Sequence, residues 1–207
     1  MSEVPDILDA LRRMKVVGAN ETPVITALSG GVSGDVFRVE LASGTICVKR
    51  ALPKLRVAAE WLAPVERIHS EVDWFRFAGE VEPGCVPRII AEDKTAHLFA
   101  MNYFEPADYP GWKAQLLEGQ VDSDFAGQVG RATASIHRAS AGRAEVAAKF
   151  AHDEMFMALR IEPYLLYTAK AHPDRDVVDM RGRHVSAEWI SKTAASRTAS
   201  ASSSLPV

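Results

Sequence analysis

The chain has 207 residues, of which 47% are hydrophobic and 25% are charged, and this composition is typical of a globular protein. Its net charge of −3 provides no basic surface for nucleic acid or an anionic membrane, and no apolar run approaches the ~18 residues of a membrane span. The amino-terminus lacks the apolar segment of a signal peptide, and the two cysteines, Cys47 and Cys85, have neither disulfide-framework nor metal-site spacing. We therefore expect a cytoplasmic protein with reduced thiols that binds neither nucleic acid nor membrane.

The amino-terminal region predicts a helix followed by a strand. Residues 4–15 place apolar side chains on one helical face, and Pro5 suits the first turn. Gly18 ends this helix, and the β-branched residues over 24–28 predict the first strand. The apolar face of the helix consists of Ile7, Leu8, Leu11 and Met14.

The stretch 28–51 is the central feature of the sequence. It predicts a glycine-rich turn, a strand, a tight turn at 43–44 and a second strand that carries Lys49, because apolar residues alternate with polar ones on both sides of the tight turn. Glycines have no Cβ, so their backbone can approach a ligand closely and successive amides can point at an anion. The glycines of the turn are Gly30, Gly31 and Gly34. A cation facing such amides suits phosphate; the alternative is an ordinary turn and a solvated lysine.

A helix over 65–78 follows, and it offers two possible partners for Lys49. At 100° per residue, Glu71 lies about 60° from Ile68 on the helix circumference, whereas Glu66 lies about 160° away, toward solvent. A glutamate that reaches a strand lysine must lie near the buried face, so we expect Glu71 to be the partner. The alternative is that Glu71 is only a charge at the rim of the helix. The apolar face consists of Val65, Ile68, Val72 and Phe75.

The next segments predict a second hairpin and a short helix. Residues 88–91 and 98–103 form two strands joined by a polar turn, and a loop with two prolines leads to a helix near 112–118.

Longer helices are predicted in the second half of the chain. A helix over 123–139 has Ser123 or Asp124 as its N-cap. Residues 150–171 are also helical, with a second segment that starts at Pro163. The expected buried stripe of the first helix is Phe125, Val129, Ala132, Ile136 and Ala139, and the expected core of the second region is Phe156, Leu159 and Leu166.

Two short motifs carry a resemblance to a known family. Ser29-x-Gly31-x-x-Gly34-x-Val36 resembles the glycine-rich loop of protein kinases, and residues 46–49, Ile-Cys-Val-Lys, resemble the kinase strand that carries the nucleotide-binding lysine. The Gly-Gly-x-Ser form of the loop is closer to the aminoglycoside phosphotransferase family, which shares the kinase fold and phosphorylates small-molecule hydroxyls. The resemblance covers roughly residues 24–171.

The resemblance implies an α+β, protein-kinase-like fold. Residues 1–104 would form a complete amino-terminal β-lobe that binds nucleotide and includes helix C. Residues 105–190 would form a partial helical carboxy-terminal lobe. From Ser191 the chain is nearly all serine, alanine and threonine, so we expect residues 191–207 to be a disordered tail.

The resemblance also implies a site for ATP and Mg²⁺. Lys49 would hold phosphates, Glu71 would orient Lys49, and the glycine-rich loop would cover the phosphates. Cys47 matches the small residue that lines the adenine pocket, and the backbone of residues 101–104 would hold adenine. The full set of expected nucleotide-binding residues is Ser29, Gly31, Ser33, Gly34, Val36, Cys47, Lys49, Glu71, Met101, Asn102 and Tyr103.

The catalytic part of the family pattern has no counterpart in the sequence. Transfer requires a histidine-x-aspartate loop with an asparagine five residues on, followed by a metal-binding aspartate. The asparagines of this chain are Asn20 and Asn102, and no aspartate follows Asp179. The triplet 172–174, His-Pro-Asp, continues a helical pattern, so we interpret it as a helix-ending turn. We therefore assign no catalytic or metal-binding residue, and expect a truncated or frame-shifted phosphotransferase that is inactive as written.

Two other interpretations remain open. The chain is either a non-catalytic nucleotide-binding protein, that is, a pseudokinase or scaffold, or an unstable fragment with exposed apolar helix faces. The acceptor substrate and the oligomeric state are not predicted by the sequence.

Overall fold

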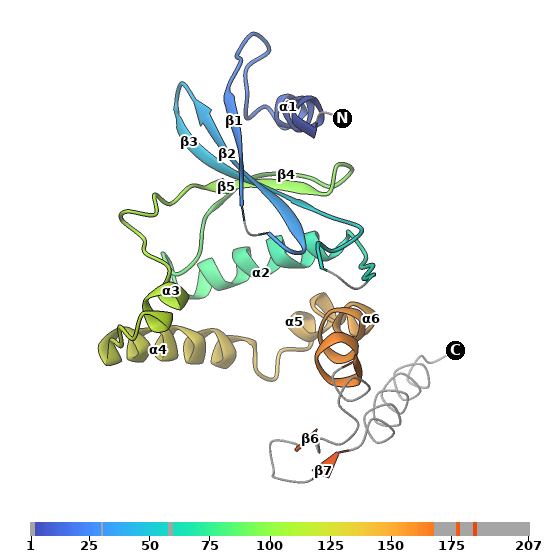
Figure 1. The fold of residues 1–207 in the computed structure, drawn as a ribbon, viewed down its shortest axis with the longest axis vertical. Coiled ribbons are helices and arrows are strands. Elements are labelled where there is room, and N and C mark those ends of the chain that lie inside the picture. Colours follow the sequence, from blue (N-terminus) through green and yellow to red (C-terminus); the bar gives the residue numbers. More distant parts are fainter. Residues whose placement is uncertain (1–2, 30, 58–59, 168–176, 179–183, 186–207) are drawn as a thin grey trace. The chain divides into compact units, whose positions relative to one another are not determined.

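The computed structural model describes residues 3–29, 31–57, 60–167, 177–178 and 184–185 (Figure 1). Gly30, the triplet 172–174 and the serine-rich tail from Ser191 lie outside the described residues. The chain divides into two compact units, residues 1–149 and residues 150–207. The first unit holds the predicted amino-terminal lobe together with the helices up to residue 149.

The first unit is built on a five-stranded antiparallel sheet. Its strands run in the order β1-β2-β3-β5-β4 (Figure 1). A β-bulge between Ile89 and Ala91 interrupts the pairing of the last two strands. With its helices this sheet forms an α+β arrangement that is consistent with a kinase-like fold. The strands are β1 (Val24–Leu28), β2 (Gly34–Leu41), β3 (Gly44–Ala51), β4 (Ile89–Asp93) and β5 (Leu98–Asn102).

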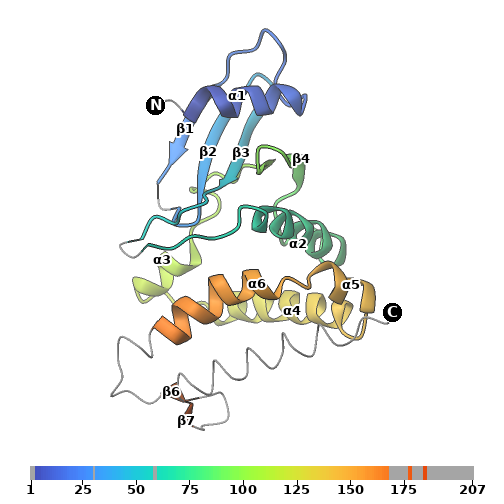
Figure 2. The same ribbon diagram turned by 90° about the vertical axis from the view of Figure 1, so that its right-hand side faces the viewer.

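Helix α1 (Glu3–Arg13) lies across one face of the sheet, as Figure 2 shows. The predicted apolar face is confirmed: Ile7 and Leu11 are fully buried, and Leu8 and Met14 pack against the same core. The sheet contributes alternate residues to this core, because side chains two apart on a strand share a face. These are Phe37, Val39, Ile46, Val48, Leu98 and Ala100.

Helix α2 (Arg67–Val81) packs against the opposite face of the sheet (Figure 2). It begins two residues after the predicted start and ends three residues after the predicted end. Ile68 and Val72 are buried against Phe99, and Val65 and Phe75 pack against the same cluster. The predicted apolar face of this helix is therefore confirmed.

Three further helices complete the first unit: α3 (Trp112–Leu117), α4 (Ser123–Ser140) and α5 (Ala144–Lys149). The predicted N-cap of α4 is wrong, since the cap is Asp122, whose carboxylate accepts from the backbone N–H groups of residues 124 and 125 at 2.9 Å. The predicted buried stripe is also wrong: no residue of α4 is buried, and Phe125 is 39% exposed. Val129, Ala132, Ile136 and Ala139 are only half-buried, where α4 packs on α2, and Phe125 contacts the ring of Trp112. Helix α5 was not predicted.

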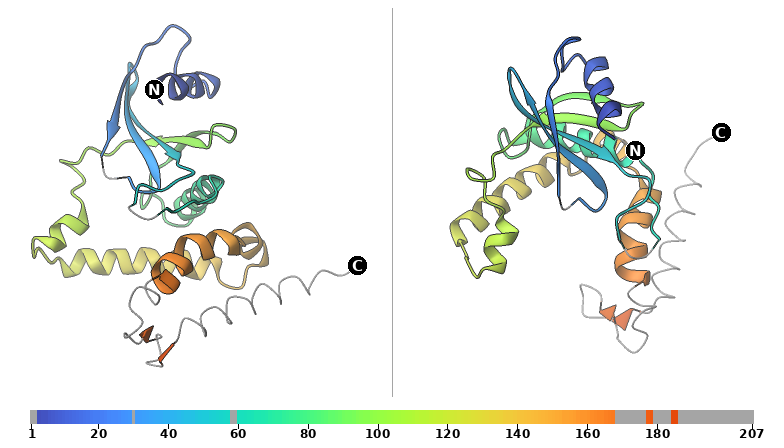
Figure 3. Two further views of the ribbon diagram at one scale, coloured as in Figure 1. Left: turned by 45° about the vertical axis from the view of Figure 1, so that its right-hand side comes forward. Right: turned by 45° about the horizontal axis from the view of Figure 1, so that its top comes forward.

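The second unit begins with the α-helix α6 (Asp153–Phe156). A π-helix, η1 (Met157–Leu166), continues it without a break (Figure 3). Pro163 lies inside η1, so it does not start a new segment as predicted. Phe156 is 54% exposed, which contradicts its assignment to a core. Leu159 and Leu166 are half-buried. An unpredicted strand pair, β6 (Val177–Val178) and β7 (His184–Val185), follows. Of the described helices, none combines the length and apolarity that crossing a membrane requires.

Candidate functional site

The register of the sheet brings the predicted lysine strand and its neighbours together on the α2 side. Val36 pairs with Lys49 and Lys49 with Phe99, so these three residues form one row across β2, β3 and β5. The next row on the same face consists of Arg38, Cys47 and Met101. Residues directly opposite one another in a sheet share a face. The predicted residues Val36, Cys47, Lys49 and Met101 therefore lie on one surface.

Lys49 and Glu71 form an ion pair between this surface and α2. Lys49 Nζ donates to Glu71 Oε1 at 2.5 Å. The two side chains are 24% and 33% exposed, so the pair is partly shielded from solvent. Glu66, the alternative partner, is exposed. The contact between Lys49 and Glu71, which we predicted from the helical position of Glu71, is therefore confirmed.

The glycine-rich loop turns from β1 into β2 beside Lys49. A Cβ on Gly31 would lie 2.2 Å from the carbonyl oxygen of Gly34, and a Cβ on Gly34 would lie 2.7 Å from the carbonyl oxygen of Arg50. Neither distance is possible for a real side chain, so backbone packing requires glycine at both positions. The same Gly34 Cβ would lie 3.6 Å from Lys49 Cε, so the lysine stem runs directly beside the loop. Ser29 and Ser33 are exposed in the loop.

Cys47 is buried in the sheet between Arg38 and Met101. Burial raises the pKa of its thiol to about 11, although the positive charge of Lys49 opposes this shift. The thiol therefore stays protonated at neutral pH and contributes a small apolar surface to this face.

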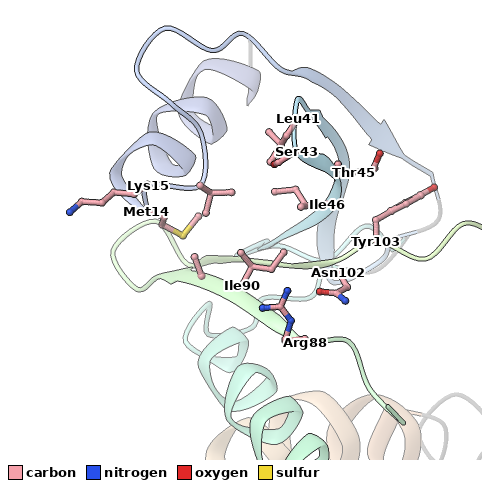
Figure 4. A pocket seen from close by; sticks show the side chains of 13 residues that line it. Met14, Lys15, Leu41, Ser43, Thr45, Ile46, Arg88, Ile90, Asn102 and Tyr103 are labelled. Carbon is pink, nitrogen blue, oxygen red and sulfur yellow. The ribbon is translucent and has the colours of Figure 1, made fainter. Parts of the chain in front are cut away.

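The predicted hinge begins at the end of β5. The Asn102 backbone N–H donates to the Arg88 carbonyl at 3.2 Å, and Asn102 pairs with Ile46 on the α1 side of the sheet. The Asn102 side chain, together with Arg88 and Tyr103, lines a cavity of about 540 Å³ that does not include Lys49 (Figure 4). The structure thus separates the Asn102 side chain from Lys49. A role for the backbone of residues 101–104 stays a prediction.

Tyr103 contacts the sheet through Arg38, whose guanidinium lies 5.4 Å from the centre of the tyrosine ring. Arg38 Nη2 also lies 3.6 Å from the Glu105 carboxylate. These contacts hold the chain that leaves β5 against the row of Cys47 and Met101.

Four charged residues around the glycine-rich loop were not predicted: Asp35, Arg50, Arg56 and Arg67. Asp35 is 4% exposed and accepts from Arg50 at 2.8 Å and from Arg56. Arg67 donates to four carbonyl oxygens, including those of Ser33 and Leu52. Burial lowers the pKa of Arg67, and the nearby charges of Glu71 and Glu66 act in the opposite direction.

The sequence did contain a signal for two of these residues. Arg67 precedes Glu71 by four positions, so both lie on the same face of the helix. Asp35 alternates with Phe37 and Val39 on β2, which places a carboxylate on a buried face where it needs a partner.

Magnesium would need a set of oxygen ligands. In the described part of the chain, no group of three or more His, Cys, Asp or Glu side chains could hold a metal ion. These residues do not fit a magnesium centre, and we assign no step to one. The amides of the glycine-rich loop and the Lys49 ammonium, by contrast, fit a phosphate group.

Comparison with known proteins identifies the family. The model of the phosphotransferase enzyme family, APH, matches residues 24–199. A search of curated proteins gives no match. The matched range includes the glycine-rich loop, Lys49 and Glu71. The chain therefore belongs to the phosphotransferase enzyme family, as its resemblance to the aminoglycoside phosphotransferases predicted.

Proposed function

We propose that this chain binds ATP on the α2 side of the sheet, with α2 in the role of helix C. The observation that carries the proposal is the 2.5 Å contact between Lys49 Nζ and Glu71 Oε1, directly beside the glycine-rich loop. Glu71 holds the ammonium group toward the space under the loop. An ammonium held there attracts the negative charge of a triphosphate.

Each group of predicted residues has a part in this binding. The loop residues Ser29, Gly31, Ser33 and Gly34 cover the phosphates through their backbone N–H groups. The side chains of Val36 and Cys47 contact the adenine ring, while the backbone of residues 101–103 forms its hydrogen bonds. Residues 1–104 are the nucleotide-binding lobe in this proposal, and residues 105–190 are part of the helical lobe.

Family membership implies phosphotransferase-like chemistry with a nucleotide and a small-molecule substrate. Bound ATP and Mg²⁺ supply the phosphoryl group and the charge that neutralises it in such reactions. We propose that residues 1–207 bind ATP without transferring its phosphate, because the asparagine of the family's catalytic loop has no counterpart after Asn102. A non-catalytic nucleotide-binding role then fits this chain better than turnover.

Calorimetric titration with ATP tests the binding proposal. We expect saturable binding to the unmodified chain and an affinity at least about tenfold lower for Lys49→Met, because a lost hydrogen bond between charged groups is worth that much. Glu71→Gln should also weaken binding. Lys94→Met is the matched control, because Lys94 is an exposed lysine in the turn between β4 and β5. No binding by the unmodified chain, or unchanged binding by Lys49→Met, would contradict the proposal.

A separate assay of ADP formation with Mg²⁺ and small hydroxyl compounds tests the absence of transfer. We expect no turnover above the level of a heat-denatured sample. Turnover that disappears in Lys49→Met would instead establish an active enzyme.

A further inference from the structure

Arg67 lies at the start of α2 and joins three segments that are distant in the sequence. Its Nη1 donates to the carbonyl oxygens of Ala63 at 3.0 Å and Pro64 at 2.6 Å. Its Nη2 donates to the carbonyl oxygen of Leu52 at 2.6 Å and to that of Ser33. One guanidinium therefore connects α2 to the end of β3 and to the glycine-rich loop.

The loop is also attached directly to the connection between β3 and α2, which runs beside this end of the sheet (Figure 2). The Ser33 carbonyl accepts from the Leu52 N–H at 3.2 Å, and the Val32 carbonyl accepts from the Arg56 N–H at 2.9 Å. The Arg56 side chain in turn forms an ion pair with the buried carboxylate of Asp35, which lies in β2 two residues after Ser33. The Ser33 carbonyl is thus the acceptor that the loop, this connection and α2 share.

A fixed Ser33 carbonyl also fixes a neighbouring donor. In a trans peptide the carbonyl and the following N–H point in opposite directions, and the described residues contain no cis peptide. The Gly34 N–H is therefore directed away from Arg67 and into the turn of the loop. This N–H is one of the donors that the proposed function assigns to phosphate binding.

The charges around the loop favour the same ligand. Lys49 and Glu71 neutralise each other, and Asp35 pairs with both Arg50 and Arg56. The acceptors that the structure describes for Arg67 are carbonyl oxygens, which carry no net charge. The guanidinium therefore brings a positive charge beside the loop, which the nearby carboxylates of Glu71 and Glu66 partly offset.

From these contacts we propose that Arg67 is a positioning residue of the nucleotide site. It holds the Ser33 carbonyl, and with it the Gly34 N–H, in the orientation that phosphate binding requires. It also couples this orientation to the position of α2, which carries Glu71 on the same face. This inference rests on the proposed function, because it concerns the same phosphate-binding site.

The test compares ligands with and without phosphates. Arg67→Ala and Arg67→Lys are titrated with ATP and with adenosine, and circular dichroism shows whether each variant is folded. We expect ATP affinity to fall at least about tenfold in both variants, since the hydrogen bonds that orient the loop are lost. Adenosine affinity should stay within about twofold, because its contacts lie on Val36, Cys47 and the hinge. Arg76→Ala is the matched control, an arginine of the same helix that is 45% exposed.

Arg67→Lys separates position from charge. Lysine keeps the positive charge but cannot reach the Ser33 and Leu52 carbonyls with a planar fork. Normal ATP affinity in Arg67→Lys would overturn the proposal, as would an equal loss of ATP and adenosine affinity in both variants. If Arg67→Ala does not fold, the result for Arg67→Lys decides.

The outcome for Lys49→Met separates this inference from the proposed function. An unmodified chain that binds no ATP overturns both. An unmodified chain whose ATP affinity depends on Lys49 but not on Arg67 overturns this inference alone.

Discussion

The Cys47 thiol is a titratable group that the fold buries beside the Lys49 ammonium. Its pKa rises from an ordinary value of 9.0 to about 11, because burial penalises the thiolate more than the lysine charge favours it. The folded protein therefore keeps this proton at a pH where the unfolded chain has lost it. The stabilisation that follows is fully present below pH 9 and is lost as the pH rises from about 9 toward 11.

This difference predicts an alkaline loss of stability that depends on one residue. We expect the free energy of unfolding to fall by roughly 1–2 kcal/mol more between pH 9 and pH 11 in the unmodified chain than in Cys47→Ala. Urea denaturation at several pH values measures the two slopes. Cys85→Ala is the control. Because Cys85 is exposed, this variant should leave most of the dependence of the unfolding free energy on pH unchanged. Equal slopes in the unmodified chain and Cys47→Ala would show that this thiol does not titrate differently on folding.

At the scale of the element, the end of α1 shows how one backbone conformation positions a whole helix. Lys15 has φ 59°, in the left-handed region that favours glycine. The Lys15 N–H donates to the Arg12 carbonyl at 2.9 Å and the Val16 N–H to the Leu11 carbonyl at 3.0 Å. This pair of bonds is a Schellman motif, which turns the chain from α1 back toward β1.

Glycine at this position should stabilise the protein. Lys15→Gly relieves the strain of a left-handed residue with a Cβ, so we expect unfolding to cost up to about 1 kcal/mol more. Lys15→Ala is the matched control, because it removes the same side chain and keeps the strain. Thermal and urea denaturation measure both variants. A Lys15→Gly variant no more stable than Lys15→Ala would show that the left-handed conformation costs little here.

Elements with a local signal could be predicted from the sequence, and those that depend on distant partners could not. Strand alternation gave the hairpin of β2 and β3, and the 100° step of a helix selected Glu71 over Glu66 as the neighbour of Lys49. Both signals lie within a few consecutive residues. The hydrogen bonds of Arg67 were not predicted, because Ser33 and Leu52, whose carbonyl oxygens accept them, precede it by 34 and 15 positions.

The errors have the same physical origin. The apolar stripe of α4 has the correct helical spacing, but burial depends on what packs against a helix, and spacing alone does not contain that information. Pro163 favours the start of a helix in isolation, yet it lies inside a π-helical segment, which local propensity does not predict.

At the scale of the whole molecule, the match to the family begins at residue 24, after α1 has ended. Even so, α1 buries Ile7, Ala10 and Leu11 completely against the sheet. Adjacent residues of β3 face opposite sides: Val48 packs in the α1 core, and Lys49 pairs with Glu71 of α2. The helix outside the family match therefore supports the strand that carries the proposed nucleotide site.

This arrangement predicts that a substitution in the α1 core reduces ATP binding, although the proposed ATP site lies on the opposite face of the sheet. Leu11→Ala should lower the free energy of unfolding by about 2–5 kcal/mol, a large part of the ~5–15 kcal/mol that a typical domain has. ATP binding should then decrease in proportion to the unfolded fraction, while the folded molecules keep their affinity. Leu117→Ala is the control, because Leu117 is 79% exposed and should change stability by less than about 0.5 kcal/mol.

Denaturation followed by circular dichroism, and titration with ATP at temperatures below and within the transition, measure both quantities. If α1 detached alone, Leu11→Ala would lose helical signal early while the sheet and the ATP affinity stayed intact. A single transition that removes helix, sheet and ATP binding together would mean that both faces of the sheet unfold as one cooperative unit. We expect the single transition, because β3 contributes Val48 to the α1 core and Lys49 to the pair with Glu71, so both faces depend on the same strand.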